Sequence, residues 1–237
     1  MSFDCTTRTH VGLRRKCNED SVLSLPEKGM WAIADGMGGH DAGEVASAKV
    51  IEALAALPPV DDPQVQADAA LQALAEVNRE LVELAQPGFG NRTIGSTVVG
   101  LVIGAGQYRC FWAGDSRAYL LRNGTLRPIT RDHSLVQGLV DAGMMDEAEA
   151  AEHPNAHVLT RAVGAALRLE VEVAGGEALP GDLFLLASDG LTRVVGLLEL
   201  QEALQSGTPE QAAGGLIATT LARGAPDNVT LAIVRIC

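Results

Sequence analysis

Three acidic residues in this sequence follow or precede apolar runs, and each stands beside glycine or asparagine. They are Asp35 before Gly36, Asp189 before Gly190, and Asp227 before Asn228. A single Asp-Gly pair is typical of a turn, but its recurrence favours one cluster assembled from distant parts of the chain. A carboxylate at a strand end, beside glycine backbone that allows close approach, suits a hard metal ion.

Nearby loops offer further oxygen ligands, namely the carboxylates of Glu19 and Asp20 and the backbone carbonyl of Gly36. The sequence has no cysteine and histidine set with zinc spacing, and ligation by oxygen alone suits Mg²⁺ or Mn²⁺. Converging carboxylates would repel one another and raise each other's pKa, whereas two divalent cations would cancel most of that charge. Such a pair of ions can bridge a water, lower its pKa and direct it at a phosphoryl centre.

A phosphate group bound at such a centre also needs a partner on the protein. Arg15 lies four residues before Glu19, within the basic stretch Arg14-Arg15-Lys16. A guanidinium binds two phosphate oxygens at once, which lysine cannot do. The alternative is a solvated basic patch, which we prefer for Arg14 and Lys16.

Hydrophobic patterning predicts the elements that position these groups. Strands are expected at residues 6–13, 22–25, 31–34, 96–103, 108–113, 118–121, 167–173, 183–187 and 229–236. Helices are expected from about residue 43, over 65–86, over 197–204, and from 208 to about 224. Short turns between strands favour antiparallel pairing, and the polar segment 135–166 is expected to form an inserted flap. The alternation of strand and helix blocks predicts one α+β domain over residues 1–237.

Composition narrows the classes of partner. A net charge of −12 argues against nucleic acid or an anionic membrane as the main partner. The four cysteines show no Cys-x-x-Cys spacing, which favours reduced thiols in the cytoplasm. The N-terminus lacks signal-peptide features, and no apolar run approaches the roughly 18 residues that span a bilayer. We therefore expect a soluble, cytoplasmic protein.

A series of short motifs carries a family resemblance across nearly the whole chain. In order they are RKCNED (15–20), ADGMGGH (34–40), GSTVV (95–99), AGDSRAYLLR (113–122), DHSLVQ (132–137), HP (153–154) with VLTRAVG (158–164), ASDGLT (187–192) and PDNVT (226–230). Each motif alone is weak, but the ordered set is specific. The sequence resembles the metal-dependent serine/threonine protein phosphatases called PPM or type 2C, in their compact bacterial form.

The resemblance implies a four-layer α-β-β-α sandwich of two antiparallel sheets, with the metals at one edge between the sheets. Two Mn²⁺ or Mg²⁺ ions are expected, with Asp35 bridging them and the Gly36 carbonyl on one. Asp189 and Asp227 are expected on the other ion. Glu19 and Asp20 would act directly or through waters, and Arg15 would hold the substrate phosphate.

Bacterial members of this family often have a third, weaker metal site, which here would fall to Asp115 and Asp189. From sequence chemistry alone, a hairpin turn is the better interpretation of Asp115 in Gly-Asp-Ser-Arg. Arg193 stands where many relatives carry a small polar or acidic residue, which would alter either the water shell or the third metal.

The proton donor is a further departure from the family pattern. Many eukaryotic members have histidine directly after Asp-Gly, but this sequence has Met37. A thioether cannot donate a proton. The acid is therefore expected to be a metal-bound water or His40, although His40 is also suited to a structural role at the start of a helix.

These features predict hydrolysis of phosphoserine and phosphothreonine on proteins by direct attack of a metal-bridging hydroxide. The expected partners are phosphorylated proteins, among them a bacterial Ser/Thr kinase and its substrates, and a monomer is expected. Among single-domain relatives, some oppose the kinase of type VI secretion and others oppose kinases of growth and cell-wall control.

Two other functions are weighed against this one. A non-catalytic phosphoprotein-binding module would predict lost ligands, yet Asp35, Asp189 and Asp227 remain. A nuclease fits poorly with the net charge of −12.

Overall fold

The computed structural model of this chain describes residues 1–38, 42–85 and 94–237. Its strands are β1 (Phe3–His10), β2 (Asp20–Leu25), β3 (Met30–Met37), β4 (Gly95–Ser96), β5 (Val98–Gly104), β6 (Gln107–Ala113), β7 (Arg117–Arg122), β8 (Thr125–Pro128), β9 (Glu172–Glu177), β10 (Leu183–Ala187) and β11 (Val229–Ile236). Its helices are α1 (Ala42–Ala55), α2 (Pro63–Leu84), α3 (Leu135–Asp141), α4 (Glu147–Glu152), α5 (Asp189–Thr192), α6 (Leu197–Gln205) and α7 (Pro209–Ala222). None of these described helices is both long and apolar enough to cross a membrane.

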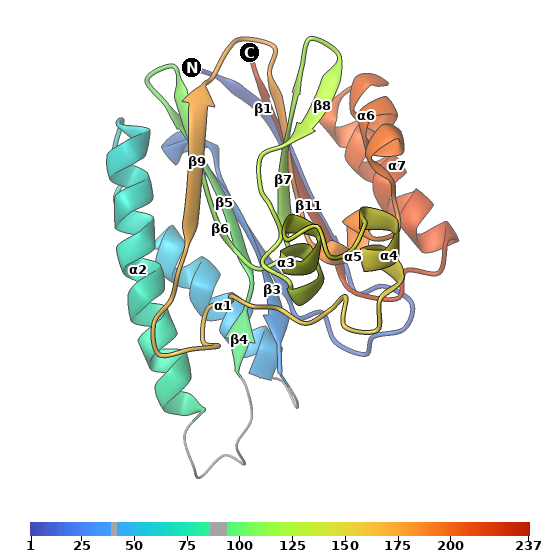
Figure 1. The fold of residues 1–237 in the computed structure, drawn as a ribbon. Helices are drawn as coiled ribbons and strands as arrows, with labels where there is room; N and C mark the ends of the chain where they lie inside the picture. Colours follow the sequence, from blue (N-terminus) through green and yellow to red (C-terminus); the bar gives the residue numbers. More distant parts are fainter. Residues whose placement is uncertain (39–41, 86–93) are drawn as a thin grey trace.

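Two antiparallel sheets form the centre of the molecule. The first has the strand order β1-β11-β10-β7-β8, and the second has the order β2-β3-β5-β6-β9, with β4 paired to β3. Figure 1 shows α1 and α2 on the outer side of one sheet and α6 and α7 on the outer side of the other. The predicted four-layer α-β-β-α sandwich is therefore confirmed.

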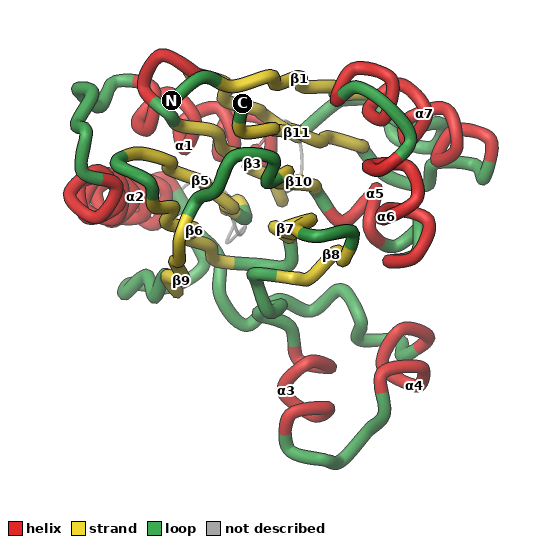
Figure 2. The backbone as a smooth tube through the Cα atoms, turned by 90° about the horizontal axis from the view of Figure 1, so that it is seen from above, coloured by secondary structure: helices red, strands yellow, loops and turns green. Residues whose placement is uncertain are grey.

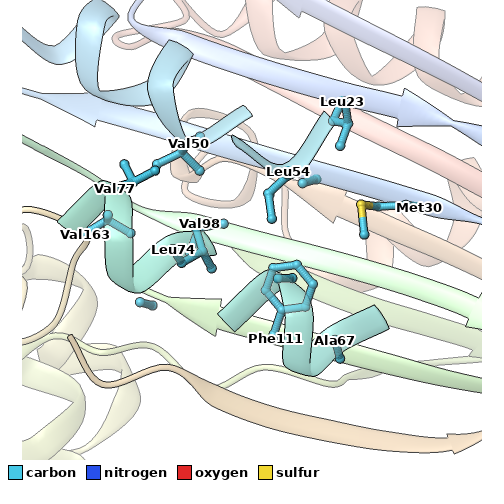
Figure 3. Packing of buried hydrophobic residues seen from close by; sticks show 14 of the residues in the cluster. Leu23, Met30, Val50, Leu54, Ala67, Leu74, Val77, Val98, Phe111 and Val163 are labelled. Atoms are coloured by element: carbon cyan, nitrogen blue, oxygen red, sulfur yellow. The ribbon is translucent and has the colours of Figure 1, made fainter. Parts of the chain in front are cut away.

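Alternation along the strands explains the layers, because successive side chains of a strand point to opposite faces. On β3, Met30, Ala32 and Ala34 pack toward the helices α1 and α2, in the cluster shown in Figure 3. Trp31 and Ile33 face the other sheet instead. Every strand with buried residues on both faces thus joins two cores, one under the helices and one between the sheets.

Two predicted strands have different bounds in the structure. The strand predicted at 167–173 is instead β9, which pairs with β6 from Gln107↔Glu177 to Trp112↔Glu172. Because β6 ends at Ala113, the alternating residues before Glu172 have no neighbouring strand with which to form backbone hydrogen bonds. The N-terminal strand ends at His10 rather than at residue 13, since Gly12 has a φ of +79° and turns the chain.

The helices α3 and α4 project away from the two sheets, as Figure 2 shows. Each begins with a side-chain cap: Ser134 accepts from the Gln137 N–H at 3.2 Å, and Asp146 accepts from the Glu149 N–H at 2.8 Å. Isolated bridges at Ser134↔Leu159 and Ser96↔Val163 return the chain to the body of the molecule. The role of this segment as a flap stays a prediction.

Candidate metal centre and phosphate site

The register of β2 and β3 brings the first two predicted ligands together. Asp20 lies directly opposite Asp35 in this antiparallel pair. Val22 and Ile33 contribute to the core between the sheets, and the alternation continues from them to Asp20 and Asp35. Both carboxylates therefore belong to the edge of the layer between the two sheets.

A serine connects the second sheet to these carboxylates. The Ser188 hydroxyl donates to Asp20 Oδ2 at 2.8 Å and accepts from the Thr230 N–H at 3.0 Å, while the Ser188 N–H donates to the Thr230 carbonyl at 2.9 Å. Ser188 lies between the end of β10 and Asp189, the first residue of α5. Asp189 is thus fixed at the edge where Asp20 and Asp35 lie.

Asn228 holds the loop that carries Arg15 and Glu19. Its side-chain oxygen accepts from the Glu19 N–H at 2.8 Å, and its amide nitrogen donates to the carbonyls of Val11 and Cys17 at 2.8 and 2.9 Å. Asn228 directly precedes β11 and follows Asp227. Neither Asn228 nor Ser188 was predicted to have a role, although each is the direct neighbour of a predicted ligand, Asp227 or Asp189.

Gly36 is required by close backbone approach rather than by its φ angle. A Cβ at this position would lie 2.0 Å from the Gly43 carbonyl oxygen and 2.7 Å from the Glu19 carbonyl oxygen. The Gly36 N–H donates to that same Glu19 oxygen at 3.1 Å. The start of α1, the loop before β2 and the end of β3 therefore meet at Gly36 as bare backbone.

The loop carrying Asp115 is tied to the backbone of Asp35 through Thr97. Thr97 donates its N–H to the Asp35 carbonyl at 2.8 Å, and its hydroxyl accepts from the Asp35 N–H at 3.0 Å. The hydroxyls of Thr97 and Ser116 share a hydrogen bond of 2.8 Å. Asp115 itself is only 6% exposed, so it is a buried acidic group and not merely a surface turn residue.

Arginines contact three of the predicted ligands. Arg15 Nη2 lies 2.7 Å from Asp227 Oδ2. Arg193 Nη2 lies 2.9 Å from Asp115 Oδ2, and its Nε lies 2.8 Å from Asp189 Oδ2. Among the described residues, no group of three or more Asp, Glu, His or Cys side chains is arranged so that it could hold a metal ion.

Most of the predicted site residues are brought to one edge of the sandwich. Asp20 pairs with Asp35 across the strands, and Asp35 also repels Asp189, Asp115 and Asp227. Arg193 joins Asp115 to Asp189. Glu19 lies against α1, because a Cβ on Gly43 would fall 2.5 Å from Glu19 Oε1. Met37 ends β3 beside these groups, whereas His40 lies outside the described residues.

Comparison with known proteins assigns the family to which this arrangement of residues belongs. The family described as Protein phosphatase 2C matches residues 10–222. The chain belongs to the protein phosphatase 2C family. The resemblance predicted from the ordered motifs is therefore confirmed.

Relatives with curated names are also serine/threonine phosphatases. PstP of Mycobacterium tuberculosis H37Rv is 40% identical over 229 residues, which are 95% of this chain and 43% of PstP. The chain thus spans less than half the length of that relative. Stp of Listeria monocytogenes EGD-e is 34% identical over 241 residues, covering 96% of this chain and 93% of Stp.

Solved structures give the same fold at high similarity. PppA, described as a key regulatory component of T6SS in Pseudomonas aeruginosa, has a TM-score of 0.91 and 41% identity over 99% of this chain and 98% of its own. The catalytic domain of PstP in complex with two manganese ions has a TM-score of 0.86 and 37% identity, over 98% and 97% of the two chains.

At this phosphatase 2C site, burial and mutual repulsion raise the pKa values of the carboxylates despite the nearby arginines. Burial, and then repulsion from neighbouring carboxylates, raises the pKa values of Asp35 and Asp189 well above the ordinary aspartate value. Burial also raises the pKa of Asp20 to about 6, against hydrogen bonds from Thr230 and Ser188 that lower it. Asp20 Oδ1 is buried without a hydrogen-bond partner. An all-oxygen donor set with an unpartnered carboxylate oxygen fits Mg²⁺ or Mn²⁺.

The raised pKa of Asp20 predicts a pH-dependent stability of the metal-free phosphatase. An aspartate of pKa near 4 when unfolded and about 6 when folded binds its proton more tightly in the folded state. Its contribution to the free energy of unfolding is full below about pH 4 and is lost as the pH rises through about 6. The loss is up to about 3 kcal/mol, at about 1.4 kcal/mol per pKa unit.

Thermal unfolding in chelator, from pH 4 to pH 7, measures this term as the difference between the wild type and Asp20→Asn. Because asparagine does not titrate, the subtraction removes the contributions of carboxylates that do not interact with Asp20, and it keeps the repulsion of Asp20 with Asp35 and Asp189 as part of the measured difference. We expect the wild type to lose stability relative to Asp20→Asn as the pH rises. A pH-independent difference would show that Asp20 does not titrate as its burial implies.

Proposed function

We propose that this protein phosphatase 2C chain hydrolyses phosphoserine and phosphothreonine monoesters on proteins, with bound Mn²⁺ or Mg²⁺. The observation that carries the proposal is the convergence of Asp20, Asp35, Asp189 and Asp227 at one edge between the sheets, with Arg15 beside them. The serine/threonine phosphatase names of its relatives support it.

Two cations would be held by Asp35, Asp189 and Asp227 with the Gly36 carbonyl, while Glu19 and Asp20 act directly or through waters. The related PstP domain in complex with two manganese ions supports this number. Such ions supply activation of water and neutralisation of charge on the phosphoryl oxygens. The protein's own contribution is to fix the carboxylates, through the Asp20–Asp35 register and the Ser188 and Asn228 hydrogen bonds.

Arg15 is the group that binds the substrate phosphate. Its side chain is 51% exposed and reaches Asp227, so it lies at the open side of the acidic cluster. Its planar guanidinium offers two parallel donors to two phosphate oxygens. A cation held by Asp227 would weaken the ion pair of that carboxylate with Arg15 and leave the guanidinium free to bind the substrate phosphate.

The leaving serine or threonine oxygen needs a proton that Met37 does not supply, because a thioether is not a donor. The proton comes from water or from His40. The alternatives differ in their effect on the pH profile, since only an imidazole titrates near neutral pH.

The substrates are phosphorylated proteins in the cytoplasm, including a bacterial Ser/Thr kinase and its targets, and the phosphatase acts as a monomer. The net charge of −12 supports protein rather than nucleic-acid substrates. The similarity to PppA, a key regulatory component of T6SS in its own organism, supports a role in type VI secretion control.

Phosphate release from matched peptides tests the proposed function. With Mn²⁺ present, we expect phosphothreonine and phosphoserine peptides to be hydrolysed and a phosphotyrosine peptide of the same sequence to be hydrolysed much more slowly. Binding of the phosphothreonine peptide by folded protein without any phosphate release would favour the non-catalytic binding module instead.

A further inference from the structure

Arg193 occupies the place where Asp115 and Asp189 approach each other. Its Nη2 and Nε contact one carboxylate each, at 2.9 and 2.8 Å. The two carboxylates come from different parts of the chain, one from the turn after β6 and one from the first residue of α5. A single guanidinium therefore joins both acidic groups, in a planar geometry that suits carboxylate oxygens.

The local fold fixes Arg193 in this position. It follows α5 directly, and its N–H donates to the Asp189 carbonyl at 2.9 Å. Asp189 and Arg193 are thus separated by one helical turn, at the i and i+4 positions where side chains meet. The Asp115 and Asp189 side chains are 7% and 15% exposed, so solvent screens their attraction to the guanidinium only weakly.

The same guanidinium also holds the segment that follows α4. Arg193 Nη1 contacts the His157 imidazole, and Nη2 donates to the Ala156 carbonyl at 3.4 Å. This segment is a short turn, in which the Ala156 N–H donates to the His153 carbonyl at 2.9 Å and the Val158 N–H donates to the Asn155 carbonyl at 3.1 Å. All three guanidinium nitrogens therefore have partners.

We propose that Arg193 is an internal cation that takes the place of a divalent ion between Asp115 and Asp189 and tethers residues 156–157 to the metal centre. The inference rests on the proposed function, because it concerns how many ions that centre holds. A divalent ion placed between these two carboxylates would meet the fixed positive charge of Arg193 at short range, and the repulsion is doubled by the ion's two charges.

The third ion that the family resemblance assigns to Asp115 and Asp189 is accordingly replaced here by the protein's own side chain. The contact with Arg193 uses Oδ2 of Asp189, so the other carboxylate oxygen would hold an ion of the two-metal centre. Arg193 is thus a positioning residue: it orients Asp189 and holds the 156–157 segment.

Counting bound Mn²⁺ by equilibrium dialysis tests the inference without reference to activity. We expect the wild type to bind two ions per chain and Arg193→Met to bind three at the same free Mn²⁺ concentration. Adding Asp115→Asn to Arg193→Met should return the count to two, since the gained ion needs both carboxylates. Arg8→Met removes an arginine that pairs with Glu210 on the surface, and it should leave the count at two.

Three ions in the wild type, or only two in folded Arg193→Met, would overturn the inference while leaving the proposed phosphatase function intact. No bound ion in the wild type would contradict the proposed function itself. The wild-type count remains decisive even if Arg193→Met does not fold.

Amide hydrogen exchange tests the tether separately. We expect the amides of Ala156 and Val158 to exchange faster in metal-free Arg193→Met than in the wild type or Arg8→Met, because the turn loses its contact with the guanidinium. Unchanged protection at these two amides would show that Arg193 does not hold the segment.

Discussion

Asp35→Asn is expected to lower kcat by more than about 100-fold, since even residues that only support metal ligands change activity by about 10–100-fold. Asp35 lies opposite Asp20 and interacts with Asp115, Asp189 and Asp227. It is therefore the central residue of the acidic cluster. Asparagine keeps the size of the side chain but removes the negative charge that a bridging ligand needs. Initial rates on a phosphothreonine peptide and Mn²⁺ affinity by calorimetry measure the two effects.

Asp182→Asn is the matched control for this variant. Asp182 is a buried carboxylate, 2% exposed, that forms an ion pair with Arg122 at 2.6 Å. It directly precedes the first residue of β10, at the end of the strand away from Asp189. Its loss should reduce the thermal stability and leave kcat and Mn²⁺ affinity unchanged. Wild-type turnover in Asp35→Asn would show that Asp35 does not bridge the ions.

Arg15→Ala is expected to raise KM for phosphopeptides by about 10–100-fold. The substitution removes charged hydrogen bonds to the phosphate, which contribute about 1.5–3 kcal/mol to binding. Each loss of about 1.4 kcal/mol weakens the affinity for the peptide by a factor of ten. A residue that binds the phosphate equally in the ground and transition states affects KM more than kcat. Steady-state kinetics over a range of peptide concentrations separate the two constants.

Arg14→Ala is the control, because Arg14 is an exposed neighbour for which we predict only solvation. Its KM should equal that of the wild type. Arg15→Ala should also keep its Mn²⁺ count, since Asp227 loses only its ion pair with Arg15. An unchanged KM in Arg15→Ala would place the phosphate elsewhere.

Much of the fold follows from hydrophobic alternation, and the regions that it misses are those where tertiary pairing decides. The apolar run at the start of β3 predicts a strand with two buried faces, and the structure has such a strand. Trp31 and Ile33 lie on one face, and Met30 and Ala32 lie on the other. The extension of β3 through Asp35 was not predicted, because polar residues break the pattern even though they pair with β2. The position of β9 depends on where its partner β6 ends, which local sequence does not encode.

In the candidate site, too, some residues can be predicted from the sequence and others depend on tertiary packing. The acidic residues beside glycine are visible in the sequence because a turn, a close backbone approach and a carboxylate coincide at Asp35-Gly36. The partners that hold them are not visible, since Ser188 and Asn228 act through hydrogen bonds to Asp20 and Glu19, far away in the chain. The two-carboxylate contact of Arg193 depends on the same long-range packing.

The dependence of phosphate release on metal tests most directly the claim that this is a metal-dependent phosphatase. Release from a phosphothreonine peptide is measured on dialysed protein, first during titration with Mn²⁺ or Mg²⁺ and then after addition of EDTA. We expect no turnover without metal, full turnover when two ions are bound per chain, and complete loss of turnover in EDTA. Turnover that persists in EDTA would contradict a metal-dependent phosphatase, as would folded protein that binds the ions and releases no phosphate.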